Sequence, residues 1–170
     1  MRSYAWKGFV LLVVVMVGGC GYRFSGGDYP GGTRTISVEL FENRTNVTRI
    51  ESVLTNDIIN EITRLRRASL VERQADADAV LTGTITSITV TTVSRTTALT
   101  ANERRVIMTT VVSLTSHDGT ELWRREMSDS QTFGVDTDDK QRTELNKQEA
   151  LTRASRKLAQ RIYNGLTEDF

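Results

Sequence analysis

Apolar side chains recur every three or four positions in two stretches of the chain, and this spacing predicts two amphipathic helices. The first stretch covers about residues 47–65, and its apolar positions are Val47, Ile50, Leu54, Ile58, Ile62 and Leu65. The second covers about residues 147–167, with Leu151, Ala154, Leu158, Ile162 and Leu166. Thr48 with Glu51, and Asn146 with Glu149, have the spacing of N-terminal capping pairs, which predicts where both helices begin.

Alternation of apolar and polar residues predicts the strands. Residues 35–41 alternate, with Ile36, Val38 and Leu40 toward one side, and residues 70–71 indicate a short strand. Residues 80–133 are rich in β-branched side chains, which favour strands over helices. This region divides into three long strands, at about residues 80–94, 104–115 and 122–133, and a His117-Asp118-Gly119 turn joins the last two.

The first long strand changes phase in its middle. Leu81, Gly83 and Ile85 share one side of an ideal strand, whereas Ile88 and Val90 fall on the other. A β-bulge near residues 86–87 would reconcile them, because one extra residue switches the face on which the following side chains lie. Without a bulge, both faces would need cover, and part of that cover would have to come from outside this chain.

The longer elements follow in the order β-α-β-β-β-α. Each amphipathic helix needs an apolar surface against which to bury its stripe, and one face of a sheet supplies it. The pattern therefore predicts an α+β fold. In this two-layer sandwich, two helices pack on the same face of a four-stranded mixed sheet with long strands. Residues 35–170 are expected to form this single domain.

The N-terminus has the layout of a bacterial export signal. Arg2 and Lys7 are basic, ten apolar residues follow at 8–17, and small residues lead to Cys20, the only cysteine of the 170-residue chain. Residues 1–19 are therefore expected to be a signal peptide, and Cys20 the lipidated first residue of the mature protein. The alternative is an ordinary signal followed by a buried or chance cysteine. Residues 20–34, rich in glycine, are expected to form a flexible tether.

Charge and side-chain chemistry exclude several classes of function. Removing the signal takes away two of 22 basic residues against 21 acidic ones, so the balance moves from +1 to −1, which argues against nucleic-acid binding. His117 is the only histidine, and the chain has no G-x-S-x-G motif. Asp136, Asp138 and Asp139 suggest a calcium loop, but Lys140 stands at the third acidic position of that pattern. We therefore expect no enzyme activity, no metal and no cofactor.

Arginines gather near one end of the long strands. Arg95 and Arg104 flank the connection between the first two, so both are expected near the tip of a hairpin. Their planar guanidinium groups can form paired hydrogen bonds to phosphate oxygens, and with hydrophobic neighbours they could bind an anionic amphiphile. The alternative is ordinary solvated surface charge.

A series of short motifs resembles one family in order and spacing. These motifs are Cys20-Gly21-Tyr22-Arg23-Phe24, Phe41-x-Asn43, Ile50-Glu51, Ala77-Asp78-Ala79-Val80-Leu81-x-Gly83, Thr100-Ala101, Ala150-Leu151 and Leu158-Ala159. Together they resemble the lipopolysaccharide-assembly lipoprotein family LptE over nearly the whole mature chain.

The resemblance implies a lipoprotein anchored at the periplasmic face of the outer membrane. Members of that family plug the LptD β-barrel, help it to assemble, and bind lipopolysaccharide on its way to the outer leaflet. Their lipopolysaccharide-contacting basic residues lie near the hairpin tip and before the last helix, which points to Arg95 and Arg104, and to Lys140 or Arg142. An alternative function is an outer-membrane lipoprotein that regulates a peptidoglycan synthase.

Overall fold

The computed structural model describes residues 29–65, 69–94 and 102–168. The predicted signal peptide, Cys20 and Arg95 lie outside these residues. The elements are η1 (Pro30–Gly32), β1 (Thr35–Val38), β2 (Glu42–Asn43), α2 (Ile50–Leu65), β3 (Ser69–Leu70), η2 (Gln74–Asp76), β4 (Ala79–Ser94), β5 (Asn102–Ser116), β6 (Glu121–Val135) and α3 (Lys140–Glu168).

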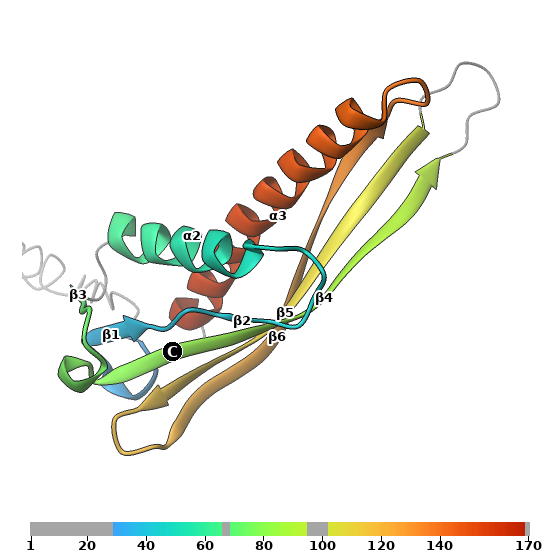
Figure 1. Cartoon of the computed structure of the whole chain (residues 1–170). Coiled ribbons are helices and arrows are strands. Elements are labelled where there is room, and N and C mark those ends of the chain that lie inside the picture. Colours follow the sequence, from blue (N-terminus) through green and yellow to red (C-terminus); the bar gives the residue numbers. More distant parts are fainter. Residues whose placement is uncertain (1–28, 66–68, 95–101, 169–170) are drawn as a thin grey trace, which may run out of the picture.

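The strands form one mixed sheet in the order β3-β1-β4-β5-β6, with β2 beside β4. β1 runs parallel to β3 and β4, whereas β4, β5 and β6 form an antiparallel meander. Both helices lie on the same side of the sheet (Figure 1). α3 follows β5 and β6, and α2 packs against α3 (Figure 1). The predicted α+β fold with two helices on one face is confirmed. The short strand predicted at residues 70–71 is β3, and β2 is an additional short strand.

The core lies between the helices and the facing side of the sheet. Ile50, Leu54, Ile58 and Ile62 of α2 are buried, and so are Leu151, Ala154, Leu158, Ile162 and Leu166 of α3. Leu40 contradicts its prediction, because its side chain is 66% exposed. β1 ends at Val38, and Phe41 turns into the core instead, where its backbone N–H donates to Thr55 Oγ1 at 3.1 Å.

A bulge in β4 resolves the change of phase. The pairing of β4 with β5 shifts register between Ile85 and Ser87. Paired residues on antiparallel strands share a face, so Ile88, opposite buried Met108, points to the helix side like Leu81 and Ile85. Most of the opposite face consists of threonine and serine. Its members include Thr82, Thr84, Thr89 and Thr91 of β4, Thr109 and Ser113 of β5, and Ser128, Ser130 and Thr132 of β6. The same face also carries apolar Val80, Ile107 and Val111 and charged Arg105, Arg124 and Glu126.

Both predicted helix caps were wrong. α3 begins at Lys140, seven residues before the predicted start, because Asp139 Oδ1 accepts the backbone N–H of Arg142 at 2.9 Å and caps the helix there. Asn146 instead donates its Nδ2 to the carbonyl of Gly134 at 2.9 Å. At the start of α2, Glu51 Oε2 accepts Nδ2 of Asn43 at 2.8 Å, so its carboxylate is bound from β2.

The folded body includes residues before 35. Tyr29 is 1% exposed, and its ring meets that of Tyr163 edge-on, with centroids 6.4 Å apart. Pro30 and Thr33 are also buried, and Thr33 Oγ1 donates to the Pro30 carbonyl at 2.6 Å. The last part of the predicted tether therefore packs onto the domain. Within the described ranges, neither helix is long and apolar enough to cross a membrane.

Candidate functional site

Three predicted basic residues meet at one end of the sheet. β5 begins at Asn102, β6 ends at Val135 opposite it, and α3 begins at Lys140. This end, which we call the distal end, lies at the top of Figure 1. It brings together Arg104, Lys140 and Arg142, although they come from different elements.

Strand pairing fixes the face on which each arginine of β5 lies. Arg104 pairs with Thr92 of β4 and with Phe133 of β6, whose side chain is buried. Arg104 therefore extends from the helix side of the sheet. Its neighbour Arg105 belongs to the row of Thr91 and Thr132 on the opposite, hydroxyl-rich face. The two arginines, although adjacent in sequence, lie on opposite faces of the sheet.

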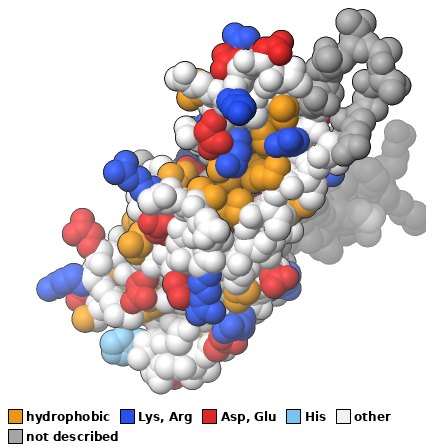
Figure 2. Space-filling view, turned by 45° about the vertical axis from the view of Figure 1, so that its right-hand side comes forward, with side chains coloured by type: hydrophobic (Ala, Val, Ile, Leu, Met, Phe, Trp, Pro, Cys, Tyr) orange, Lys and Arg blue, Asp and Glu red, His pale blue; other side chains and the backbone are white. Residues whose placement is uncertain are grey.

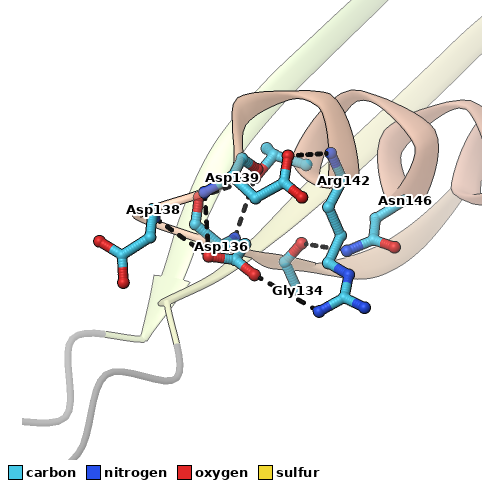
Figure 3. A network of polar contacts seen from close by, with 7 residues as sticks. Gly134, Asp136, Asp138, Asp139, Arg142 and Asn146 are labelled. Carbon is cyan, nitrogen blue, oxygen red and sulfur yellow. Dashed lines mark hydrogen bonds and ion pairs between the residues drawn. The ribbon is translucent and has the colours of Figure 1, made fainter.

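The acidic connection between β6 and α3 is a structured turn (Figure 3). Asp136 Oδ1 accepts the backbone N–H groups of Asp138 at 3.0 Å and Asp139 at 3.1 Å. The backbone N–H of Asp136 in turn donates to Thr143 Oγ1 at 2.9 Å. These carboxylates hold the turn and cap α3. Across the described ranges, no group of His, Cys, Asp and Glu side chains has the arrangement of a metal site.

The basic residues of the distal end differ in their pairing. Arg142 Nη1 lies 3.7 Å from Asp136 Oδ2, so part of its charge is already offset. Lys147 and Arg153 have carboxylate partners on the same helix, at 3.4 and 3.6 Å. Among the described residues, Arg104 and Lys140 are exposed cations of this end that form no ion pair. They are the two best placed to meet an anionic group.

Apolar surface accompanies these cations. Val90 is 41% exposed in the row next to Arg104, and Leu145, in the second turn of α3, is 54% exposed. Figure 2 shows hydrophobic side chains gathered in the upper half of the molecule with Lys and Arg side chains beside them. Cations at the rim of an apolar surface match a ligand that carries both charge and hydrocarbon.

Sequence reasoning missed Arg153. Its Nη2 donates to the Thr132 carbonyl at 3.3 Å, and it lines a hollow of about 270 Å³ with Glu103, Phe133, Asn146 and Glu149. Arg153 lies seven residues after Asn146, so both fall on the same side of α3. The sequence could have shown this shared side of the helix, but not that it faces the backbone carbonyls of β6.

The opposite, basal end carries His117 and two larger hollows, of about 650 and 560 Å³. Its carboxylates hold the backbone. Asp78 Oδ2 accepts the N–H groups of Thr35 at 2.9 Å and Arg34 at 3.0 Å, and these bonds lower the pKa of Asp78. The N–H of Thr120 lowers the pKa of Asp118 in the same way. His117 is an exposed turn residue, as predicted.

Three solved structures share the fold. Rare lipoprotein B from Shewanella oneidensis is 16% identical, with a TM-score of 0.56, over 80% of this chain and 96% of that one. A minor lipoprotein from Acinetobacter baumannii is 12% identical, with a TM-score of 0.52, over 80% and 92%. Lipoprotein B from Nitrosomonas europaea is 14% identical, with a TM-score of 0.52, over 85% and 88%.

Comparison by sequence gives the family. No curated protein sequence matches this chain. The sequence model of LptE, described as lipopolysaccharide-assembly, matches residues 33–166, which span nearly all of the folded body. The chain therefore belongs to the LptE lipopolysaccharide-assembly family.

Proposed function

We propose that this protein is an outer-membrane lipoprotein that assembles lipopolysaccharide into the outer leaflet together with an LptD-type β-barrel. In this role it is a plug and assembly factor for the barrel and a binding subunit for lipopolysaccharide, and it catalyses no reaction. The observation that carries the proposal is the family match over residues 33–166. The distal end supports it with chemistry suited to the glycolipid.

Lipopolysaccharide binding is assigned to the distal end. A glycolipid of this class presents phosphate groups beside acyl chains, so it needs cations next to apolar surface. Arg104 and Lys140 offer such cations, Val90 and Leu145 are exposed nearby, and Arg95 joins the proposal from the hairpin connection. Arg142 is a weaker candidate because Asp136 competes for its guanidinium.

The anchor is proposed to be an acylated Cys20, exposed by removal of residues 1–19. Nine Cα–Cα steps lead from Cys20 to buried Tyr29. Since an extended chain spans at most about 3.6 Å per residue, Tyr29 stays within about 32 Å of the lipidated cysteine. The basal end would therefore stay near the membrane surface that holds the anchor.

A place inside a barrel fits the hydroxyl-rich face of the sheet. The lumen of a large outer-membrane barrel is polar. A face rich in threonine and serine can exchange hydrogen bonds with such a wall. Its charged residues, which include Arg105, Arg124 and Glu126, would find polar partners or water in such a lumen. The sequence pattern had suggested that, without a bulge, apolar residues on both faces of β4 would need cover from outside the chain. The bulge places Ile88 and Val90 on the helix side, so the support comes from the hydroxyl groups of the opposite face instead.

Purification and depletion test the proposal. The tagged full-length protein should co-purify in detergent with a large β-barrel, and its depletion should lower surface lipopolysaccharide and leave the barrel misassembled. An unchanged outer leaflet after depletion would contradict the proposal. Co-purification of a periplasmic synthase in place of a barrel would favour the peptidoglycan alternative.

The glycolipid site has a matched control within β5. Arg104→Glu should weaken lipopolysaccharide retention by about tenfold, since a hydrogen bond to a charged group contributes about 1.5–3 kcal/mol. Arg105→Glu makes the same charge change on the opposite face and should leave retention nearly unchanged. Equal losses in the two variants would show a general charge effect and refute this placement of the site.

A further inference from the structure

The turn between β6 and α3 holds the carboxylate of Asp136 in one place. Its Oδ1 accepts the backbone N–H groups of Asp138 at 3.0 Å and Asp139 at 3.1 Å. Its backbone is bound as well, because Thr143 Oγ1 accepts the Asp136 N–H at 2.9 Å and donates to the Asp136 carbonyl at 3.0 Å. Aspartate oxygens that accept backbone N–H groups a few residues ahead stabilise a turn. Asp136 Oδ2 is therefore presented at a fixed position beside α3.

Arg142 is the movable partner of this fixed carboxylate. Its Nη1 lies 3.7 Å from Asp136 Oδ2 (Figure 3), close enough for an ion pair but too far for a hydrogen bond. The Arg142 backbone is held by the helix cap, since its N–H donates to Asp139 Oδ1 at 2.9 Å. Its side chain is 70% exposed, so the guanidinium can turn away from Asp136 while the helix stays in place.

This ion pair is weaker than the contact that a phosphate group would form with Arg142. An ion pair between exposed side chains favours the paired form by at most about fivefold. A phosphate can accept two parallel hydrogen bonds from one guanidinium, and such charge-assisted bonds are about twice as strong as neutral ones. A phosphate at the distal end can therefore take Arg142 from Asp136, but it has to compete with the carboxylate.

We propose that Asp136 is an internal competitor that sets the affinity of the distal end for lipopolysaccharide. Arg142 pairs with Asp136 when the site is empty and with a phosphate of the glycolipid when the site is occupied. Lys140 has no carboxylate partner among the described residues, so it needs no such exchange. The inference rests on the proposed function and adds a reason why binding is reversible, because Arg142 has a partner to return to when the ligand is passed on.

Neutral substitutions at Asp136 test the competition. Tagged full-length protein in detergent is incubated with purified lipopolysaccharide below saturation, and the retained lipopolysaccharide is measured. Asp136→Asn keeps an oxygen that can accept the N–H groups of the turn, but it removes the charge that Arg142 meets. It should raise retention by about three- to fivefold, since it removes an ion pair of that strength. Asp136→Ser, whose hydroxyl can also hold the turn, should give a similar gain.

Asp138→Asn is the matched control. It makes the same charge change two residues away, and Asp138 contributes its backbone N–H, not its carboxylate, to the described turn. Because salt screens charges that do not touch the ligand, this variant should raise retention by less than about 1.5-fold at physiological salt. Equal gains from Asp136→Asn and Asp138→Asn would overturn the inference.

A second set of variants shows whether Arg142 carries the effect. In an Arg142→Gln background, Asp136→Asn should raise retention no more than Asp138→Asn does, because no guanidinium is left to release. In a Lys140→Gln background, the gain from Asp136→Asn should persist. A gain that survives the loss of Arg142 would overturn the inference and leave the proposed function standing. If the unsubstituted protein and every variant retain no lipopolysaccharide, the proposed binding function itself fails, and the inference fails with it.

Discussion

Gly83 in β4 lies beneath the ring of Phe41, and a side chain at this position has no room. A Cβ built on Gly83 would overlap Phe41 Cε2 and come within 2.5 Å of two further ring atoms. Phe41 cannot easily move away, because it is 2% exposed in the core and its backbone N–H is bound to Thr55. Gly83→Ala should therefore force the ring or the strand to shift.

The expected cost is that of overpacking a core, about 1–3 kcal/mol in the free energy of unfolding. For a body of this size, that corresponds to a fall of roughly 3–12 °C in Tm. Urea and thermal unfolding of the folded body, followed by circular dichroism, would measure both. Gly134→Ala is the control, since nothing lies within 4 Å of a Cβ at that strand position, and it should be close to neutral.

A double-variant cycle isolates the contact. Phe41→Ala alone should cost about 3–5 kcal/mol through the cavity that it leaves. In that background, the methyl group of Gly83→Ala enters empty space, so the second substitution should cost much less than it does alone. A coupling of at least about 1 kcal/mol is expected. Strictly additive effects of the two substitutions would refute the argument from ring contact.

Three other perturbations have defined outcomes. Asp139→Ala should cost about 1 kcal/mol in urea unfolding by removing the α3 cap, whereas Asp138→Ala, whose carboxylate caps nothing, should cost little. Arg161→Ala should cost about 1–3 kcal/mol, because Asp129, 5% exposed, loses the guanidinium 3.2 Å from its Oδ2. The pKa of Asp78 is lower in the folded protein than its value of about 3.9 in the unfolded chain. Its ionised carboxylate therefore stabilises the fold at pH values above the unfolded pKa, and this stabilisation is lost as pH falls through the folded pKa. Asp78→Asn should therefore flatten the dependence of stability on pH below about 5, and an unchanged slope would contradict this assignment.

Local patterns predicted much of the fold. The stripes of both helices and the bulge in β4 depend on residues close together in the sequence, so spacing alone revealed them. The start of α3 could not be predicted in this way. The first turns of the helix have no buried apolar stripe, since their apolar residue Leu145 is exposed, and the helix begins where Asp139 caps it. The prediction that Leu40 is buried was wrong because alternation does not show where a strand ends.

The candidate site was harder to predict because its geometry comes from pairing between strands. Sequence places Arg104 and Arg105 side by side, and only the register with Phe133 and Thr132 assigns them to opposite faces. The partner of Arg142 is Asp136, six residues earlier, and the turn that joins them forms through backbone hydrogen bonds that composition does not reveal. Sequence could name the cations, but not which of them carry uncompensated charge.

The bulge between Ile85 and Ser87 also constrains how this strand can change its length. Side chains alternate with a period of two, so removing one residue there would turn Ile88 and Val90 toward the hydroxyl-rich face and bring threonines against α3. Losing two residues would keep every later side chain on its present side. Relatives of this protein should therefore differ in this part of β4 by even numbers of residues, and odd changes should occur only where a second bulge restores the parity.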